Sequence, residues 1–165
     1  MGLLFISLII QIKNVNASES IQARIGNQYF DTLEDAIIAA SSTDTVVLTN
    51  NVVLEETLQI NKTVNINLNN HNIEANEKVF FIQGGSLNLS GTGKILETKP
   101  NYGAIMIKGS SNSNNVNYST VSVGKDVTLE GWSGIFINHD NNTAYGILVN
   151  MNGSINAIND VDGGT

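Results

Sequence analysis

The chain reads Ser86-Leu87-Asn88-Leu89-Ser90-Gly91-Thr92-Gly93-Lys94-Ile95, and the pattern returns as Thr120-Val121-Ser122-Val123-Gly124-Lys125-Asp126-Val127-Thr128-Leu129. Each stretch is an apolar alternation, a turn of small or polar residues and a second alternation, which is typical of two short strands that meet at a corner. Residues 57–66 show the same pattern, and residues 146–155 form a weaker fourth copy. The copies indicate a repeat architecture.

A further apolar run precedes each copy. The runs are Val46-Val47-Leu48, Phe80-Phe81-Ile82, Ile105-Met106-Ile107 and Ile135-Phe136-Ile137. Their first residues lie 34, 25 and 30 positions apart (46 to 80, 80 to 105 and 105 to 135). Because strand triplets at a nearly regular period are the signature of a solenoid, we predict an all-β fold, a right-handed single-stranded parallel β-helix. An antiparallel β-sandwich is the alternative, since short strands with turn signals also suit it.

The repeat also predicts which side chains point inward. Val121 and Val123 align with Leu87 and Leu89 on one strand face, so these four side chains should be buried, whereas Ser122 should face outward. The many Asn residues fit the same architecture. Asn tolerates the left-handed backbone conformation that tight corners need, and Asn side chains on successive coils can form hydrogen-bonded ladders.

The chain has one segment with a helical period, residues 32–41. Leu33, Ala36, Ile37 and Ala40 form one apolar stripe, and Thr32 is a suitable N-cap with an acid three residues on. Before this segment, short strands are predicted on both sides of a Gly26-Asn27 turn.

The first seventeen residues are predicted to be a secretory signal peptide. An apolar run over residues 3–10 is followed by Val15-Asn16-Ala17, which places small residues at the two recognition positions for cleavage after Ala17. The usual basic residues before the apolar run are missing, because only Met1 and Gly2 precede it. We therefore expect an exported protein that is secreted or held at the cell surface.

Three segments resemble one family, namely Ala23 to Ile37, Asp44-Thr45-Val46-Val47-Leu48 and Ile60 to Asn72. Together they look like the opening of pectate-lyase-like right-handed parallel β-helix proteins of bacterial surfaces. The resemblance implies that residues 18–44, with their helix, cap the N-terminal end of the solenoid, and that residues 45–165 form its coils. The chain stops where a fifth coil should open, so we expect the coils to be incomplete at the C-terminus.

Composition narrows the function classes. The 165 residues carry 8 Lys and Arg against 15 Asp and Glu, a net charge of -7. This balance leaves no basic stripe for nucleic acid, and we expect no membrane insertion after signal cleavage. No disulfide or Cys-based zinc site is possible, because the chain has no Cys.

The residues do not predict a catalytic site. Lyases of the resembled family use calcium held by acidic residues and an Arg or Lys as the base. Arg24, the single Arg, lies before the helix, where that family has no catalytic residues. Hydrolases of that fold use paired Asp residues, and no strand triplet carries an adjacent pair. His139 and Asp140 form a candidate acid/base or sugar-contacting pair in a polar loop. Trp132 is a second candidate for carbohydrate contact, because its ring could stack on a sugar.

Calcium is the one cofactor with any support. Asp160 and Asp162 in Asn159-Asp160-Val161-Asp162-Gly163-Gly164 have the spacing of oxygen ligands, but the later Glu of a complete calcium loop is missing. An ordinary turn without a bound ion is the favoured interpretation of this segment, and so we predict no cofactor.

The sequence thus predicts an exported cell-surface β-helix protein, a structural, adhesion or carbohydrate-binding module without its own catalysis. Its expected partners are glycans or other host or cell-surface ligands, not nucleic acid. The alternative is the N-terminal part of a polysaccharide lyase or glycoside hydrolase whose active-site coils lie beyond residue 165. Because one fold hosts many activities, the choice depends on the site.

Overall fold

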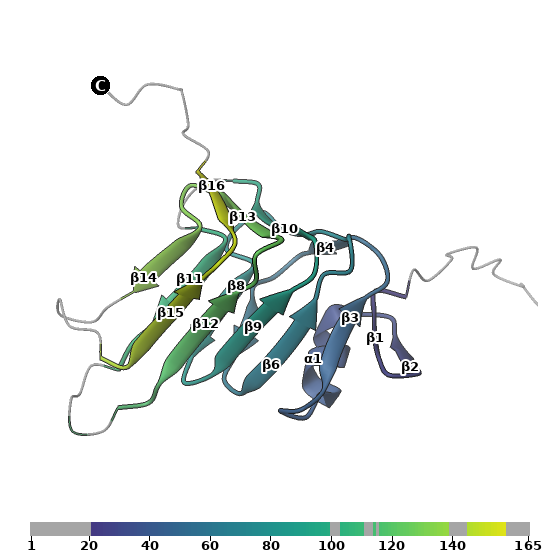
Figure 1. Ribbon diagram of the computed structural model, residues 1–165, viewed down its shortest axis with the longest axis horizontal. Helices are drawn as coiled ribbons and strands as arrows, with labels where there is room; N and C mark the ends of the chain where they lie inside the picture. Colours follow the sequence, from purple (N-terminus) through teal and green to yellow (C-terminus); the bar gives the residue numbers. More distant parts are fainter. Residues whose placement is uncertain (1–20, 100–102, 111–113, 115, 139–144, 158–165) are drawn as a thin grey trace, which may run out of the picture.

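Three parallel sheets make up most of the computed structural model, which describes residues 21–99, 103–110, 114, 116–138 and 145–157 (Figure 1). From β3 to β13 every strand pairs in parallel with the strand three places later in the chain. The chain therefore passes through the three sheets in turn, and we call each passage a coil. An all-β fold with stacked parallel sheets replaces the antiparallel sandwich alternative, because a sandwich would need antiparallel neighbours along these strands.

Each sheet collects one strand from each coil. Sheet A contains β3 (Thr45–Leu48), β6 (Thr63–Asn67), β9 (Ser86–Ser90), β12 (Ser119–Val123) and β15 (Ile147–Met151). Sheet B contains β4 (Val52–Leu54), β7 (Ile73–Ala75), β10 (Gly93–Glu97), β13 (Val127–Gly131) and β16 (Ser154–Ala157). Sheet C contains β5 (Leu58–Ile60), β8 (Phe80–Gln83), β11 (Ile105–Lys108) and β14 (Ile135–Asn138).

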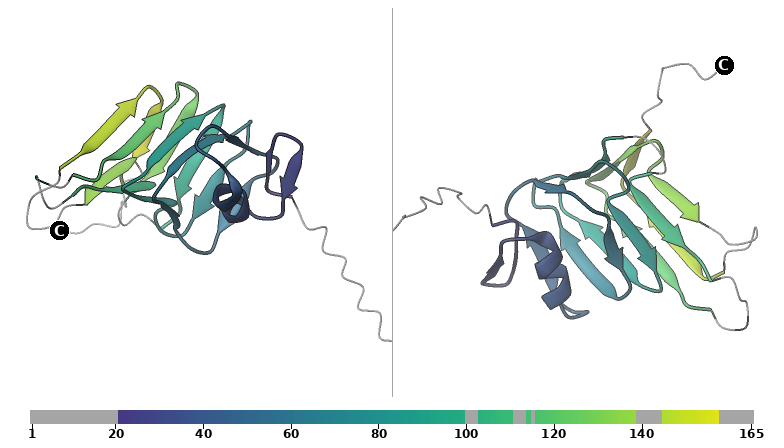
Figure 2. Two further views of the ribbon diagram at one scale, coloured as in Figure 1. Left: turned by 90° about the horizontal axis from the view of Figure 1, so that it is seen from below. Right: turned by 180° about the vertical axis from the view of Figure 1, so that it is seen from behind.

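The N-terminal end of the stack carries the remaining elements, β1 (Ala23–Ile25), β2 (Gln28–Phe30) and α1 (Leu33–Ala39). β1 pairs antiparallel with both β2 and β3, and α1 lies beside them (Figure 2). Thr32 Oγ1 accepts a hydrogen bond from the Asp35 backbone N–H at 3.1 Å, as an N-cap should. The predicted stripe is buried, since Leu33, Ala36, Ile37 and Ala40 all belong to the core.

The core lies between the three sheets and is built from alternate residues of each strand. Val121, Val123, Leu87 and Leu89 are at most 3% exposed, so the predicted inward register of β9 and β12 is confirmed. The alternation follows from strand geometry, because successive side chains point to opposite faces of a sheet. Ser122 lies on the outward face and is only half-buried.

Asn residues lie at the corners of the coils and form hydrogen bonds between coils, as the sequence predicts. Asn69 and Asn70 have positive φ angles of 48° and 65°. The Oδ1 atom of Asn51 accepts the backbone N–H of Asn72 at 2.9 Å, and Asn72 repeats this bond to Lys94 one coil further on. On sheet A the Asn88 side chain donates to Asn65 Oδ1 at 2.9 Å.

The structure corrects the phase of the first predicted repeat. The sequence pattern predicts that residues 57–60 align with the start of β9, but Leu58 pairs with Phe80 in sheet C. Likewise Val46 pairs with Ile66 in sheet A and is not equivalent to Phe80. The sheet C strands therefore begin 22, 25 and 30 residues apart (58 to 80, 80 to 105 and 105 to 135). The error arose because every corner of a coil shows the same alternation and small turn, so the pattern does not distinguish one corner from another.

The fourth repeat is displaced by two residues in its first strand. The sequence alignment placed Ile147 opposite Val121, whereas Val149 takes that position. Its second strand is aligned as predicted, with Ile155 opposite Leu129. A shift of two keeps the same side chains inward, because the side-chain period of a strand is two.

Candidate functional site

Sheet C differs from the other two sheets in what it presents to the outside. Phe81, Met106 and Phe136 lie opposite one another on β8, β11 and β14, at the central position between inward-facing residues. Met106 is only 6% exposed although it is not part of the core cluster, and both Phe residues are half-buried. An apolar column therefore runs across the outer face of sheet C, parallel to the stacking axis.

Amide side chains surround the Phe81 end of this column. A hollow of about 400 Å³ opens there, and its lining consists of Gln59, Ile60, Asn61, Phe81, Gln83 and Asn117. The four amides are exposed, and no hydrogen bond from any described residue reaches their side chains. An aromatic ring with free amide donors and acceptors around it is the combination that small polar ligands require. We call this hollow the amide groove.

A buried hydroxyl lies two residues after Asn117, at the start of β12. Ser119 is completely buried, and its Oγ accepts the Gly84 N–H at 2.9 Å while donating to the Lys108 carbonyl at 2.7 Å. Gly84 has a φ of 69°, and a Cβ there would overlap the Asn117 amide. The corner after β8 is thus joined to the start of β12, two residues from Asn117.

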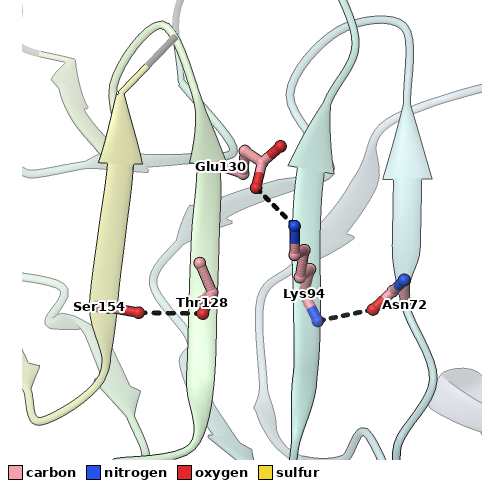
Figure 3. Close-up of polar contacts among 5 residues, drawn as sticks. All are labelled: Asn72, Lys94, Thr128, Glu130 and Ser154. Carbon is pink, nitrogen blue, oxygen red and sulfur yellow. Dashed lines mark hydrogen bonds and ion pairs between the residues drawn. The ribbon is translucent and has the colours of Figure 1, made fainter.

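The polar side chains of sheets A and B bond mainly to one another. In Figure 3 Lys94 Nζ reaches Glu130 Oε2 at 3.0 Å across neighbouring coils, and the Thr128 and Ser154 hydroxyls lie 2.9 Å apart. On sheet A, Asn150 donates to the Ser122 hydroxyl at 3.3 Å. The donors and acceptors in these ladders bond to one another. We therefore assign the ladders to stabilising the contact between coils and not to binding a ligand.

Glu130 carries one of the two pKa shifts found among the described residues. The hydrogen bond from Lys94 is the main cause that holds the pKa of the Glu130 carboxyl below its usual value, and the Asn156 side chain contributes a second bond. Burial acts in the opposite direction, and the charge of Lys94 adds further attraction. The ionised carboxylate therefore favours the folded state.

We expect Glu130→Gln to flatten the acid dependence of stability. Because the folded pKa is lowered, the contribution of Glu130 is present above its unfolded pKa of about 4.3 and is lost as the pH falls through the folded value. The variant should lose about 0.2–1 kcal/mol at neutral pH, as partly exposed ion pairs do, and should decline less in acid. Urea unfolding across this pH range measures both. Glu55→Gln on an exposed turn is the charge-matched control, and an acid decline of equal slope in wild type and Glu130→Gln contradicts the assignment.

Trp132, the predicted carbohydrate contact, follows β13 at the corner between sheets B and C. Its side chain is 51% exposed. Its backbone N–H donates to Oε2 of Glu97 at 3.2 Å, and Glu97 is completely buried. Trp132 is therefore accessible to a ligand, but it does not line the amide groove.

The remaining predicted site residues lie outside the described residues. They are His139 and Asp140, the calcium candidates Asp160 and Asp162, and the cleavage position Ala17. Across the ranges that the structure describes, no three His, Cys, Asp or Glu side chains are grouped as a metal ion would require. In the same ranges no helix has the length and apolar character to cross a membrane.

The sequence contains a signal for the apolar column of sheet C, although not for the amides around it. Phe81, Met106 and Phe136 are apolar at positions where alternation calls for a polar residue, and the aligned triplets already placed them side by side. By contrast, Asn117 and Gln59 come from different coils. Asn117 and Gln59 lie side by side only because residues 58–60 form a strand of sheet C and because the segment before β12 passes next to that strand.

Known proteins do not place the chain in a family. No protein-family model, no curated protein and no solved structure matches it. The resemblance to pectate-lyase-like proteins therefore remains a prediction, and the function has to be argued from the geometry of the site itself.

Proposed function

We propose that this protein is an exported cell-surface module, a right-handed parallel β-helix that binds glycans in the amide groove of sheet C. The stacked parallel sheets support the fold, because a chain that passes repeatedly between parallel strands turns right-handed in about 98% of cases. The apolar run followed by Val15-Asn16-Ala17 supports export.

The observation that carries the proposal is the contrast between sheet C and its neighbours. Sheets A and B present polar ladders that bond within the protein, whereas sheet C presents apolar side chains bordered by amides. Apolar surface with a polar rim marks interaction sites on soluble proteins. A sugar ring offers an apolar face and a rim of hydroxyls, so it would stack on Phe81 and bond to Gln59, Gln83 or Asn117.

The volume and the shape of the groove support a small part of a glycan as ligand. A volume of about 400 Å³ lies at the lower end of the range for ligand sites, about 300–1,000 Å³. The apolar column continues from Phe81 to Phe136 over two further coils, roughly 10 Å at the usual strand spacing. Met106 at the centre of the column is only 6% exposed, so glycan contact would be confined to the Phe81 end, where the groove opens.

The test is binding of the wild-type chain to immobilised polyuronates and neutral glycans, with Phe81→Ala as the decisive variant. We expect binding to at least one glycan class and a loss of about tenfold or more in Phe81→Ala, equivalent to about 1.4 kcal/mol. Trp132→Ala, which removes an exposed aromatic ring outside the groove, should bind like wild type.

Two results would contradict the proposal. If Trp132→Ala abolishes binding and Phe81→Ala does not, the site lies at the corner after β13. If the chain cleaves a glycan in the panel, the protein is an enzyme whose active site lies within these 165 residues, which contradicts a module without its own catalysis. Reducing ends and unsaturated products are measured in the same samples.

A further inference from the structure

A second hollow adjoins the amide groove on the side of α1. Its volume is about 480 Å³, and it shares Gln59 and Asn61 with the groove. Its charged lining consists of Glu34 from α1, Glu56 before β5 and Lys62 after β5. We call it the acidic hollow. A ligand that extends from the groove past Gln59 toward α1 therefore meets two carboxylates.

The two carboxylates of the acidic hollow are not neutralised within the protein. Glu34 and Glu56 are exposed, and neither side chain forms a hydrogen bond or an ion pair with a described residue. The Nζ atom of Lys62 donates to the carbonyls of Ile38 and Ala40 at 2.9 and 2.8 Å, which holds this cation at the C-terminal end of α1. The lining of the acidic hollow is therefore negative overall.

The amide groove supplies no positive charge that would offset this. None of the described residues that line it is charged. Lys108 lies opposite Gln83 on the neighbouring strand β11, but it is not part of the lining. The whole chain carries a net charge of -7, which adds to the repulsion of anions. Proteins recognise carboxylates mainly through Arg and Lys side chains, and the groove offers an anionic sugar neither.

Hydrogen-bonding chemistry favours the same class of ligand. The Gln and Asn side chains of the groove each have an NH₂ donor and a carbonyl acceptor. A sugar hydroxyl donates and accepts, so it can pair with both parts of an amide. A carboxylate only accepts, and it leaves the amide carbonyl without a donor. A polar group that loses water without gaining a partner weakens binding.

We propose that the amide groove selects neutral glycans over polyuronates, and that Glu34 and Glu56 determine this specificity by repelling the uronate chain. The inference rests on the proposed binding of glycans in the groove. A neutral chain stacked on Phe81 can extend toward α1 without bringing in charge, whereas each uronate brings a carboxylate into a region that is already negative.

The test compares glycans that differ in charge, using the full 165-residue chain. Polygalacturonate, its highly methyl-esterified form and a panel of neutral glycans are measured for binding at low and at high salt. We expect the best neutral ligand to bind at least about tenfold more tightly than polygalacturonate at low salt. The difference should narrow at high salt, because dissolved ions screen exposed charges.

Charge variants assign the specificity to the acidic hollow. The double variant Glu34→Gln with Glu56→Gln should bind polygalacturonate about three- to tenfold more tightly than wild type at low salt and neutral glycans unchanged. The matched control is Glu55→Gln with Glu77→Gln. It changes the net charge by the same amount, but these two residues line a different hollow. The control should bind polygalacturonate like wild type.

The outcomes separate this inference from the proposed function. If polygalacturonate binds as tightly as the best neutral glycan and Phe81→Ala weakens both, glycan binding in the groove stands and the selection of neutral glycans is wrong. If the Glu34 and Glu56 double variant leaves polygalacturonate binding unchanged, or if the control raises it equally, the role of the acidic hollow is wrong. If no glycan depends on Phe81, the proposed function fails and this inference fails with it.

Discussion

The Val123→Asp variant should lose the strands from β12 to the end of the stack while the earlier coils stay folded. Val123 is 1% exposed and packs between coils, with Leu89 opposite it on β9 and Met151 on β15. The substitution removes about 1.5–3 kcal/mol of burial and adds a carboxylate whose burial without a partner costs several kcal/mol more. A total above about 4 kcal/mol is a large share of the roughly 5–15 kcal/mol that stabilises a domain. In a stack of coils each coil contacts only its neighbours, so the loss spreads to the last coil first.

Hydrogen exchange followed by mass spectrometry resolves this pattern strand by strand. Protection of the amides in the strands from β12 to β16 should fall by about 1,000-fold, which corresponds to about 4 kcal/mol. Ser122→Asp is the control one residue away. Ser122 faces outward and its hydroxyl accepts a bond from Asn150, which a carboxylate can also accept, so the change should stay within about 0.5 kcal/mol. Equal loss in the two variants would refute the inward register of β12.

How far the fold could be predicted depended on which residues repeat clearly. The register of β9 on β12 and of β10 on β13 was readable because Leu87, Leu89 and Ile95 have apolar equivalents at identical spacing. The first coil was misplaced by one corner, since its strands are as short as three residues and its turns carry the same small and polar residues as every other corner. Periodicity identifies the strands and their inward faces, but it does not tell which corner of a coil a given turn occupies.

The candidate site was harder to predict than the fold, for a physical reason. Trp132 stood out as the single Trp of the chain, yet the amide groove forms where four common residue types from three coils meet. Gln59, Gln83 and Asn117 carry no signal one at a time in a chain rich in amides. Their meaning depends on the absence of hydrogen-bond partners among the described residues, which becomes visible only in the packed arrangement of β5, β8 and the segment before β12.

The pair Phe80→Ala and Phe81→Ala should separate stability from binding within one strand. Phe80 is 0% exposed and lies in the core opposite Leu58 and Ile105. Its replacement by Ala should cost about 3–5 kcal/mol, because lost burial and an unfilled cavity add together. Phe81 faces the amide groove and is half-buried, so Phe81→Ala should cost about 1 kcal/mol and should weaken glycan binding about tenfold or more.

Urea unfolding and glycan binding, measured on the same preparations, give two independent readouts. Phe80→Leu adds a volume control, since a large apolar side chain keeps the core filled and should cost less than about 1.5 kcal/mol. We expect Phe80→Leu to bind glycan like wild type, because the groove is lined by the opposite face of β8. If Phe81→Ala destabilises the protein as strongly as Phe80→Ala, then Phe81 belongs to the core and sheet C presents no apolar column to ligands. If Phe80→Leu loses binding while Phe81→Ala keeps it, the two residues of β8 have been assigned to the wrong faces.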